Sequence, residues 1–172
     1  KPMARFDVFN WYTAQSSPKN ENSPAPAIYS GSSVSEPESA SNPIPNSGEP
    51  SSLSVAINEI AWAGTKANTA DEWIELYNNT ASTVNLTGWT LKAIDGTPNI
   101  VFPTSSISAQ GYFLLERTNN STVNDMAADL IYTGALANEG EKLELRDSAG
   151  NLIDLVDASA GWFTGQAAPN YL

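Results

Sequence analysis

From residue 55 onward, hydrophobic and polar residues alternate in short runs that are typical of β-strands. In residues 73–77 the alternation places Ile74 and Leu76 on one face and Glu75 between them on the other. Residues 143–146 alternate in the same way. Gly, Asn and Pro separate the runs, so the pattern predicts eight strands joined by turns. They are expected at about 54–62, 73–77, 89–91, 100–102, 112–116, 130–132, 143–146 and 152–157.

Two clusters of turn-forming residues connect neighbouring runs. Residues 95–98 read Asp-Gly-Thr-Pro, which is typical of a tight turn. Residues 147–151 are expected to turn the chain into its last run and to complete a hairpin. Eight short strands with regularly spaced turns predict a single β-sandwich, and the 118 residues from 55 to 172 match the size of such a domain.

The first 54 residues differ from the rest in composition. Residues 16–54 contain thirteen Ser and seven of the eleven Pro in the chain, with few apolar residues. Such a segment buries too little apolar surface to offset the entropy of ordering it, so we expect an extended Pro/Ser-rich linker. The sequence therefore predicts three parts, which are an aromatic N-terminal arm at 1–15, a linker at 16–54 and a β-sandwich at 55–172.

The chain lacks the residues on which common catalytic sites depend. It contains neither Cys nor His, which excludes thiol catalysis, thiolate or His-ligated zinc and a Ser-His-Asp triad. No nucleophile elbow, phosphate-binding Gly loop or dinucleotide fingerprint occurs. The net charge of −11 does not give the basic footprint that nucleic-acid binding requires. We therefore expect neither an enzyme nor a nucleic-acid-binding protein, and no run of apolar residues is long enough for a membrane span.

Three segments, taken in order, resemble the lamin-tail domain family. The first is Asn58-Glu59-Ile60 followed by residues 71–78, Asp-Glu-Trp-Ile-Glu-Leu-Tyr-Asn. The second is residues 86–91, Leu-Thr-Gly-Trp-Thr-Leu, and the third is the closing hairpin around Gly150. The resemblance covers about residues 55–157 and implies an immunoglobulin-like β-sandwich of a type that also occurs in bacterial surface and secreted proteins. Because one sandwich hosts many unrelated roles, the fold alone does not give the function.

The resemblance also implies that the domain lacks its last strand. Members of the family usually have one more strand after the closing hairpin, whereas this sequence reaches Leu172 at about the place where that strand would begin. An open sheet edge is either completed by another segment or becomes a site of self-pairing. We therefore expect an incomplete edge that takes part in binding.

The N-terminal arm is the strongest candidate for a partner-binding site. Five apolar side chains gather within seven residues, and these are Phe6, Val8, Phe9, Trp11 and Tyr12. An apolar segment at the end of a long polar linker is expected to dock on another surface. We predict that it adds as a β-strand to the open edge of a neighbouring sandwich, a head-to-tail contact that permits a filament. The alternative is that the arm is the remnant of a preceding domain.

Acidic residues and tryptophans give two further candidate sites. Five acids are expected to supply oxygen ligands for Ca²⁺ if they converge at one end of the sandwich, and these are Glu59, Asp71, Glu72, Glu75 and Asp95. The alternative is that these acids cap turns, pair with Lys or Arg side chains or face solvent, so that no cofactor is bound. Trp162 is the best candidate for an exposed, sugar-stacking ring, against the alternative of core and rim packing.

Together these features favour a non-catalytic structural or binding module, outside the cell or at its surface. Its expected partners are proteins, either copies of itself or other surface proteins, with no nucleic acid. Two alternatives stay open. One is an accessory targeting or substrate-binding module of a larger exported enzyme, and the other is a Ca²⁺-dependent adhesin module.

Overall fold

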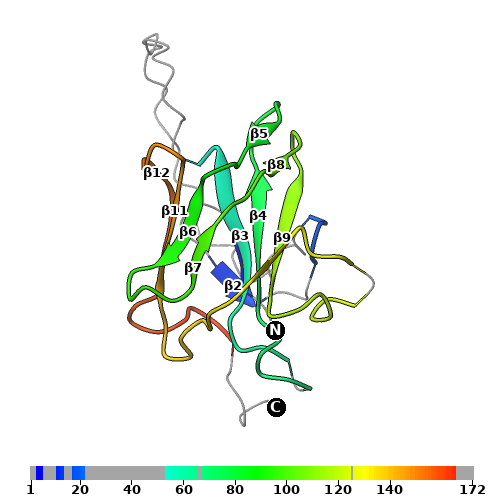
Figure 1. Cartoon of the computed structure of the whole chain (residues 1–172). Helices are drawn as coiled ribbons and strands as arrows, with labels where there is room; N and C mark the ends of the chain where they lie inside the picture. The colour runs from blue at the N-terminus through cyan, green and yellow to red at the C-terminus, as the bar shows by residue number, and fades with distance from the viewer. Residues whose placement is uncertain are drawn as a thin grey trace, which may run out of the picture.

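The part of the chain that the structure describes folds as an all-β sandwich (Figure 1). The computed structural model describes residues 3–5, 11–13, 17–21, 53–65, 67–124 and 126–165. Its strands are β1 (Met3–Arg5), β2 (Trp11–Thr13), β3 (Val55–Ala61), β4 (Trp73–Asn78), β5 (Val84–Asn85), β6 (Thr90–Ala93), β7 (Asn99–Val101), β8 (Ser106–Ile107), β9 (Tyr112–Arg117), β10 (Leu130–Tyr132), β11 (Lys142–Arg146) and β12 (Leu152–Asp157). No helix within these residues is long and apolar enough to cross a membrane. The predicted all-β, immunoglobulin-like fold is confirmed.

Two sheets form the layers of the sandwich. The larger has the strand order β10-β9-β4-β3-β1-β2, and the smaller has the order β12-β11-β6-β7, while β5 and β8 form a separate two-stranded sheet. Neighbouring strands are antiparallel except β9 and β10, which are parallel. The two strands of the N-terminal arm thus extend the larger sheet beyond β3 (Figure 1).

The core lies between the sheets and follows the alternation in the sequence. Ile74 and Leu76 on β4 and Leu143 and Leu145 on β11 are fully buried. Trp89, which precedes β6, is also buried, at 7% exposure. Burial of each such aliphatic side chain contributes about 1.5–3 kcal/mol, so these positions fix which face of every strand points inward.

All eight strands expected from the alternating pattern are present, and both turns form where they were predicted. Between β6 and β7, Gly96 has a φ of 98°, a conformation that favours glycine, and the Thr97–Pro98 peptide bond is cis. Between β11 and β12, one carboxylate oxygen of Asp147 accepts hydrogen bonds from the backbone N–H groups of residues 149 and 151, at 2.9 Å each. The sequence missed the two-residue strands β5 and β8, whose length gives no periodic signal.

The edge of β3 is divided between two neighbours. The pairing of β3 with β4 has an irregularity between Ile57 and Glu59. Before it, β3 adjoins β12, where the Ile57 N–H donates to the Asp154 carboxylate at 2.7 Å. After it, β3 pairs with β1 of the arm, with Glu59 opposite Ala4. Met3 on β1 is fully buried in the core, so the arm contributes to the sandwich itself.

Candidate interaction site

The N-terminal arm docks as a strand, and in this structure it docks on its own sandwich. β1 pairs antiparallel with β3, and β2 pairs antiparallel with β1. Of the five predicted partner-binding residues, Trp11 and Tyr12 lie on β2, where their backbones pair with Arg5 and Ala4. The other three, Phe6, Val8 and Phe9, lie outside the described residues. Strand addition by the arm is therefore seen within one chain, and its addition to a neighbouring copy stays a prediction.

A further segment, Ser17-Pro18-Lys19, lies on the outer face of the larger sheet. The Ser17 hydroxyl donates to one oxygen of the Glu59 carboxylate, and the Ser17 backbone N–H donates to the other at 3.5 Å. The Lys19 backbone N–H donates to the Glu75 carboxylate. Pro18 between them is buried. This segment falls in the region predicted as linker, so part of that region contacts the domain.

The two carboxylates beneath this segment form a cross-strand pair. Glu59 on β3 lies directly opposite Glu75 on β4, and both side chains are fully buried. Burial raises the pKa of Glu59 to about 6, although its hydrogen bonds from Ser17 oppose the shift. Burial also raises the pKa of Glu75 to about 8, with a further contribution from the charge of Glu59. Two like charges at such close range cannot both be ionised cheaply, so the pair holds a proton near neutral pH.

Polar and aromatic groups surround this carboxylate pair. The Asn58 side-chain amide donates to Glu75 at 2.8 Å. Tyr77 and Tyr112 contact each other with ring centroids 4.8 Å apart. Burial, Tyr77 and the nearby carboxylates raise the pKa of Tyr112 to about 12, so its ring remains neutral. The site therefore offers acceptors for N–H and O–H donors, which suits an extended peptide.

The Lys19 side chain ties the same segment to a more distant part of the sheet. Its ammonium nitrogen lies 2.9 Å from the Asp129 carboxylate and 3.1 Å from the Ala127 carbonyl oxygen. Asp129 precedes β10 and also accepts the Leu114 backbone N–H at 2.8 Å. The tripeptide is thus held at three points along the outer face, by Glu59, Glu75 and Asp129.

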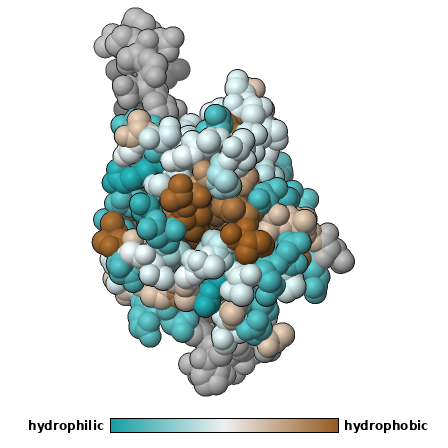
Figure 2. Space-filling view, viewed as in Figure 1, coloured by the Kyte–Doolittle hydropathy of each residue, from teal (hydrophilic) through white to brown (hydrophobic). Residues whose placement is uncertain are grey.

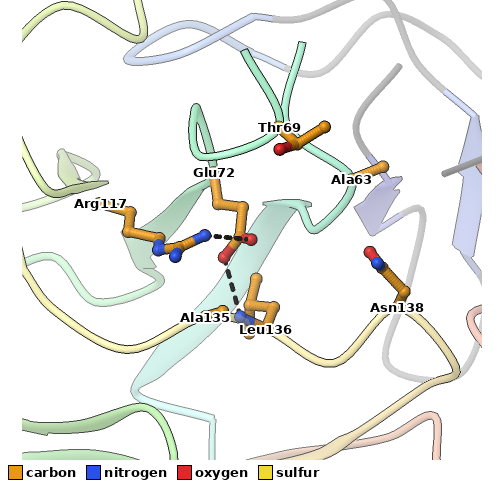
Figure 3. Close-up of a pocket in the computed structure, with 7 residues that line it drawn as sticks. All are labelled: Ala63, Thr69, Glu72, Arg117, Ala135, Leu136 and Asn138. Atoms are coloured by element: carbon orange, nitrogen blue, oxygen red, sulfur yellow. Dashed lines mark hydrogen bonds and ion pairs between the residues drawn. The ribbon is translucent and has the colours of Figure 1, made fainter. Parts of the chain in front are cut away.

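A pocket of about 220 Å³ lies at the end of the sandwich where β4 begins and β9 ends (Figure 3). Its charged side chains bind each other: Arg117 donates to Glu72 at 2.7 Å, and the Leu136 backbone N–H donates to the other oxygen of Glu72 at 2.8 Å. Glu72 is almost fully buried, and burial raises its pKa above the ordinary value. The pocket therefore joins two strands to the loop after β10, and its two charged side chains already bind each other.

Residues 49–160 match the model of one protein family, described as Lamin Tail Domain. The chain belongs to the Lamin Tail Domain family. The matched range includes all strands from β3 to β12 and confirms the resemblance seen in the sequence. A comparison with curated proteins finds no match. Domains of this family are immunoglobulin-like modules that interact with proteins and are generally non-catalytic.

The five acids considered for Ca²⁺ do not meet at one point of this lamin-tail domain. Glu59 and Glu75 form the pair on the outer face, whereas Glu72 binds Arg117 at the pocket. Asp71 accepts hydrogen bonds from its own loop, and Asp95 caps the turn between β6 and β7. Among the described residues, no group of three or more Asp or Glu side chains is placed to hold a metal ion.

Trp162 packs against the lamin-tail domain. Its ring stacks on Trp62 with centroids 5.7 Å apart and planes inclined by 7°. Its indole N–H donates to the Ala137 carbonyl oxygen at 2.6 Å. One face of the ring is therefore covered, which supports the alternative of rim packing over a sugar-stacking platform.

An apolar surface patch gives a further candidate interface. Figure 2 shows hydrophobic side chains gathered at the centre of one face, surrounded by hydrophilic ones. Exposed large apolar residues include Val101 on β7 and Ile131 on β10, which are edge strands of the two sheets. Neither strand is β3, with which β1 of the arm pairs.

Sequence reasoning found the arm but missed the segment Ser17-Pro18-Lys19 and its receptor. The alternation placed Glu75 on the outer face of its strand, which is a usable signal for one half of the receptor. The position of Glu59 opposite Glu75 depends on the irregularity in β3, for which the sequence gives no sign.

Proposed function

We propose that this lamin-tail protein is a structural module that assembles with other copies of itself through its N-terminal arm. The observation that carries the proposal is the pairing of β1 with β3, which makes the arm a removable strand of the larger sheet. The same contacts form whether the arm comes from its own chain or from a neighbour. In the proposal the arm of each copy completes the sandwich of the next, which gives a filament or an array.

The separation of the arm from the sandwich along the chain sets the conditions for this exchange. Thirty-one residues lie between Glu21 and Leu53, and their composition is that of a Pro/Ser-rich linker. A fully flexible chain of this length spans about 30 Å on average and gives an effective concentration on the order of millimolar, and a stiffer, Pro-rich chain reaches further. At micromolar concentrations the arm is therefore expected to close on its own sandwich. Where neighbouring copies are held together at millimolar local concentration, as on a crowded surface, exchange becomes competitive.

The proposal places the protein outside the cell or at its surface. The support is the resemblance of the sequence to a family that also occurs in bacterial surface and secreted proteins, together with the net charge of −11. A protein fixed at a surface reaches high local concentration without high expression, which is the condition that the arm exchange requires.

The test compares two deletions of equal size. Removal of residues 1–13 takes away β1 and β2, whereas removal of residues 30–42 shortens the linker by the same number of residues and keeps the arm. Light scattering after size-exclusion chromatography and electron microscopy are carried out from micromolar to millimolar concentration. We expect concentration-dependent assembly of the full chain and of the linker deletion, and none of the arm deletion. If the arm deletion assembled as readily as the full chain, the proposal would be refuted.

A further inference from the structure

We propose that the outer face of β3, β4 and β9 carries a docking site specific for the tripeptide Ser-Pro-Lys, and that residues 17–19 of a second copy occupy it in the assembly. The proposal rests on the proposed function, because it names the second contact by which an exchanged arm is recognised. In addition to the strand pairing of β1, the exchanged arm would then bind at a site that recognises side chains.

The docking site recognises the first residue of the tripeptide by its hydroxyl group. Glu59 accepts both the hydroxyl and the backbone N–H of Ser17, one on each carboxylate oxygen. An alanine at this position would leave one oxygen of a fully buried carboxyl without its donor, which is costly. The site therefore distinguishes a small hydroxyl residue from an apolar one.

The docking site recognises the second residue of the tripeptide by its shape and the third residue by its charge. Pro18 is buried between the two contact points, and it has no N–H that would need a partner there. Lys19 donates its backbone N–H to Glu75 and places its ammonium group between Asp129 and the Ala127 carbonyl oxygen. A cation at the third position therefore meets a carboxylate and a carbonyl oxygen.

The occupant that fits this site is a segment of the same kind of chain. The sequence Ser-Pro-Lys occurs once in the protein, at residues 17–19, and the other Ser-Pro pair, Ser23-Pro24, is followed by Ala. The thirty-one residues between Glu21 and Leu53 allow the segment to reach a second copy, as they allow β1 to do so.

The decisive experiment mixes two full-length chains with opposite charge reversals. Lys19→Glu reverses the ligand, and Asp129→Lys reverses the receptor. Alone, the Lys19→Glu variant brings two negative side chains together at this contact, and the Asp129→Lys variant brings two positive ones together. In a reciprocal dimer of the two variants, each of the two contacts joins a negative side chain to a positive one. Native mass spectrometry, with one variant isotopically labelled, counts mixed and unmixed dimers.

The expected result is strong enrichment of the mixed dimer. Reversal of one partly exposed ion pair replaces attraction by repulsion and is expected to change docking roughly tenfold. Two such contacts in one reciprocal dimer predict roughly hundredfold enrichment over the unmixed dimers. A statistical mixture, as two unmodified chains would give, overturns the proposal.

A second receptor variant guards against loss of the fold. Asp129 also accepts the Leu114 backbone N–H, which Lys cannot do. If Asp129→Lys shows no cooperative melting, Asp129→Asn replaces it, because the amide oxygen can accept the same bond. With Asn the expected enrichment falls to roughly tenfold, and a statistical mixture again overturns the proposal.

The outcome also separates this proposal from the proposed function. If removal of residues 1–13 abolishes assembly while the charge-reversed chains mix statistically, exchange of β1 stands and the Ser-Pro-Lys site falls. If the mixed dimer is enriched while removal of residues 1–13 has no effect, the tripeptide drives assembly alone and the exchange of β1 falls.

Discussion

Replacement of Glu75 by Gln is expected to change how the stability of this lamin-tail domain depends on pH. Glu75 is fully buried on β4, opposite Glu59 and beneath Lys19. Its pKa rises from 4.5 to about 8 in the folded chain because burial disfavours the charged form. A Gln side chain has nearly the same shape as the protonated carboxyl group but does not titrate, so it isolates the effect of that proton.

The size of the effect follows from the two pKa values. Between pH 4.5 and pH 8 the folded chain retains a proton on Glu75 that the unfolded chain releases. Stability therefore falls as the pH rises through this window, by up to about 1.4 kcal/mol per pH unit, and the loss reaches roughly 3 kcal/mol at pH 7. Gln removes this loss. It also exchanges one accepted hydrogen bond for a donor, since its amide group cannot accept from both Asn58 and Lys19, at a cost of about 1 kcal/mol.

The stability curves of the two chains are therefore expected to cross. Glu75→Gln should be less stable than the unmodified chain by about 1 kcal/mol at pH 4, about equally stable at pH 5, and more stable by roughly 3 kcal/mol at pH 8. Urea unfolding at pH 4, 5, 6, 7 and 8, followed by Trp fluorescence, gives the free energy of unfolding at each pH. Glu139→Gln is the matched control, because Glu139 is exposed and its replacement removes the same charge without touching the buried pair.

Parallel curves would refute this reasoning. If Glu75→Gln lowered the free energy of unfolding by the same amount at pH 5 and pH 8, Glu75 would titrate alike in the folded and unfolded chains. The outer face would then be open to water instead of covered by the arm, and the Ser-Pro-Lys contact would lose its structural basis. A crossing of the curves for Glu139→Gln would equally show that overall charge, and not the buried pair, sets the pH dependence.

Three further predictions test other parts of the structure. Arg117→Ala leaves the buried carboxylate of Glu72 without its cation and should cost about 3–5 kcal/mol in urea unfolding at pH 7. Because burial raises the pKa of Glu72, the cost in stability should shrink toward pH 4. A loss of stability that is independent of pH would contradict this. Gly140→Ala places a Cβ 2.2 Å from a backbone carbonyl oxygen and should lower the melting temperature strongly, whereas Gly150→Ala meets open space and should cost only about 1 kcal/mol; equal effects would be inconsistent with these two turns. Met3→Ala removes a fully buried arm side chain and should speed proteolysis at residues 1–21 without changing that of the sandwich, and unaltered cleavage of the arm would contradict the docking of β1.

Structural features with local causes were predictable from the sequence, whereas features that depend on distant contacts were not. Ile74 and Leu76 predicted their strand because alternation along one segment is a property of that segment alone. The turn at residues 95–98 was predictable for a similar reason, since its residues form it without help from distant strands. The two-residue strands β5 and β8 were not predictable, because their regularity comes from pairing with each other.

The sequence by itself thus determined eight of the strands from β3 to β12, the family and the apolar character of the arm. Only the tertiary structure decided that β1 lies against β3, that Glu59 faces Glu75, and that Ser17 and Lys19 bind this pair. These contacts join segments up to fifty-seven positions apart in the chain. Their register follows from the irregularity in β3 and from the packing of the whole core, in which a shift by one residue would turn every buried side chain outward.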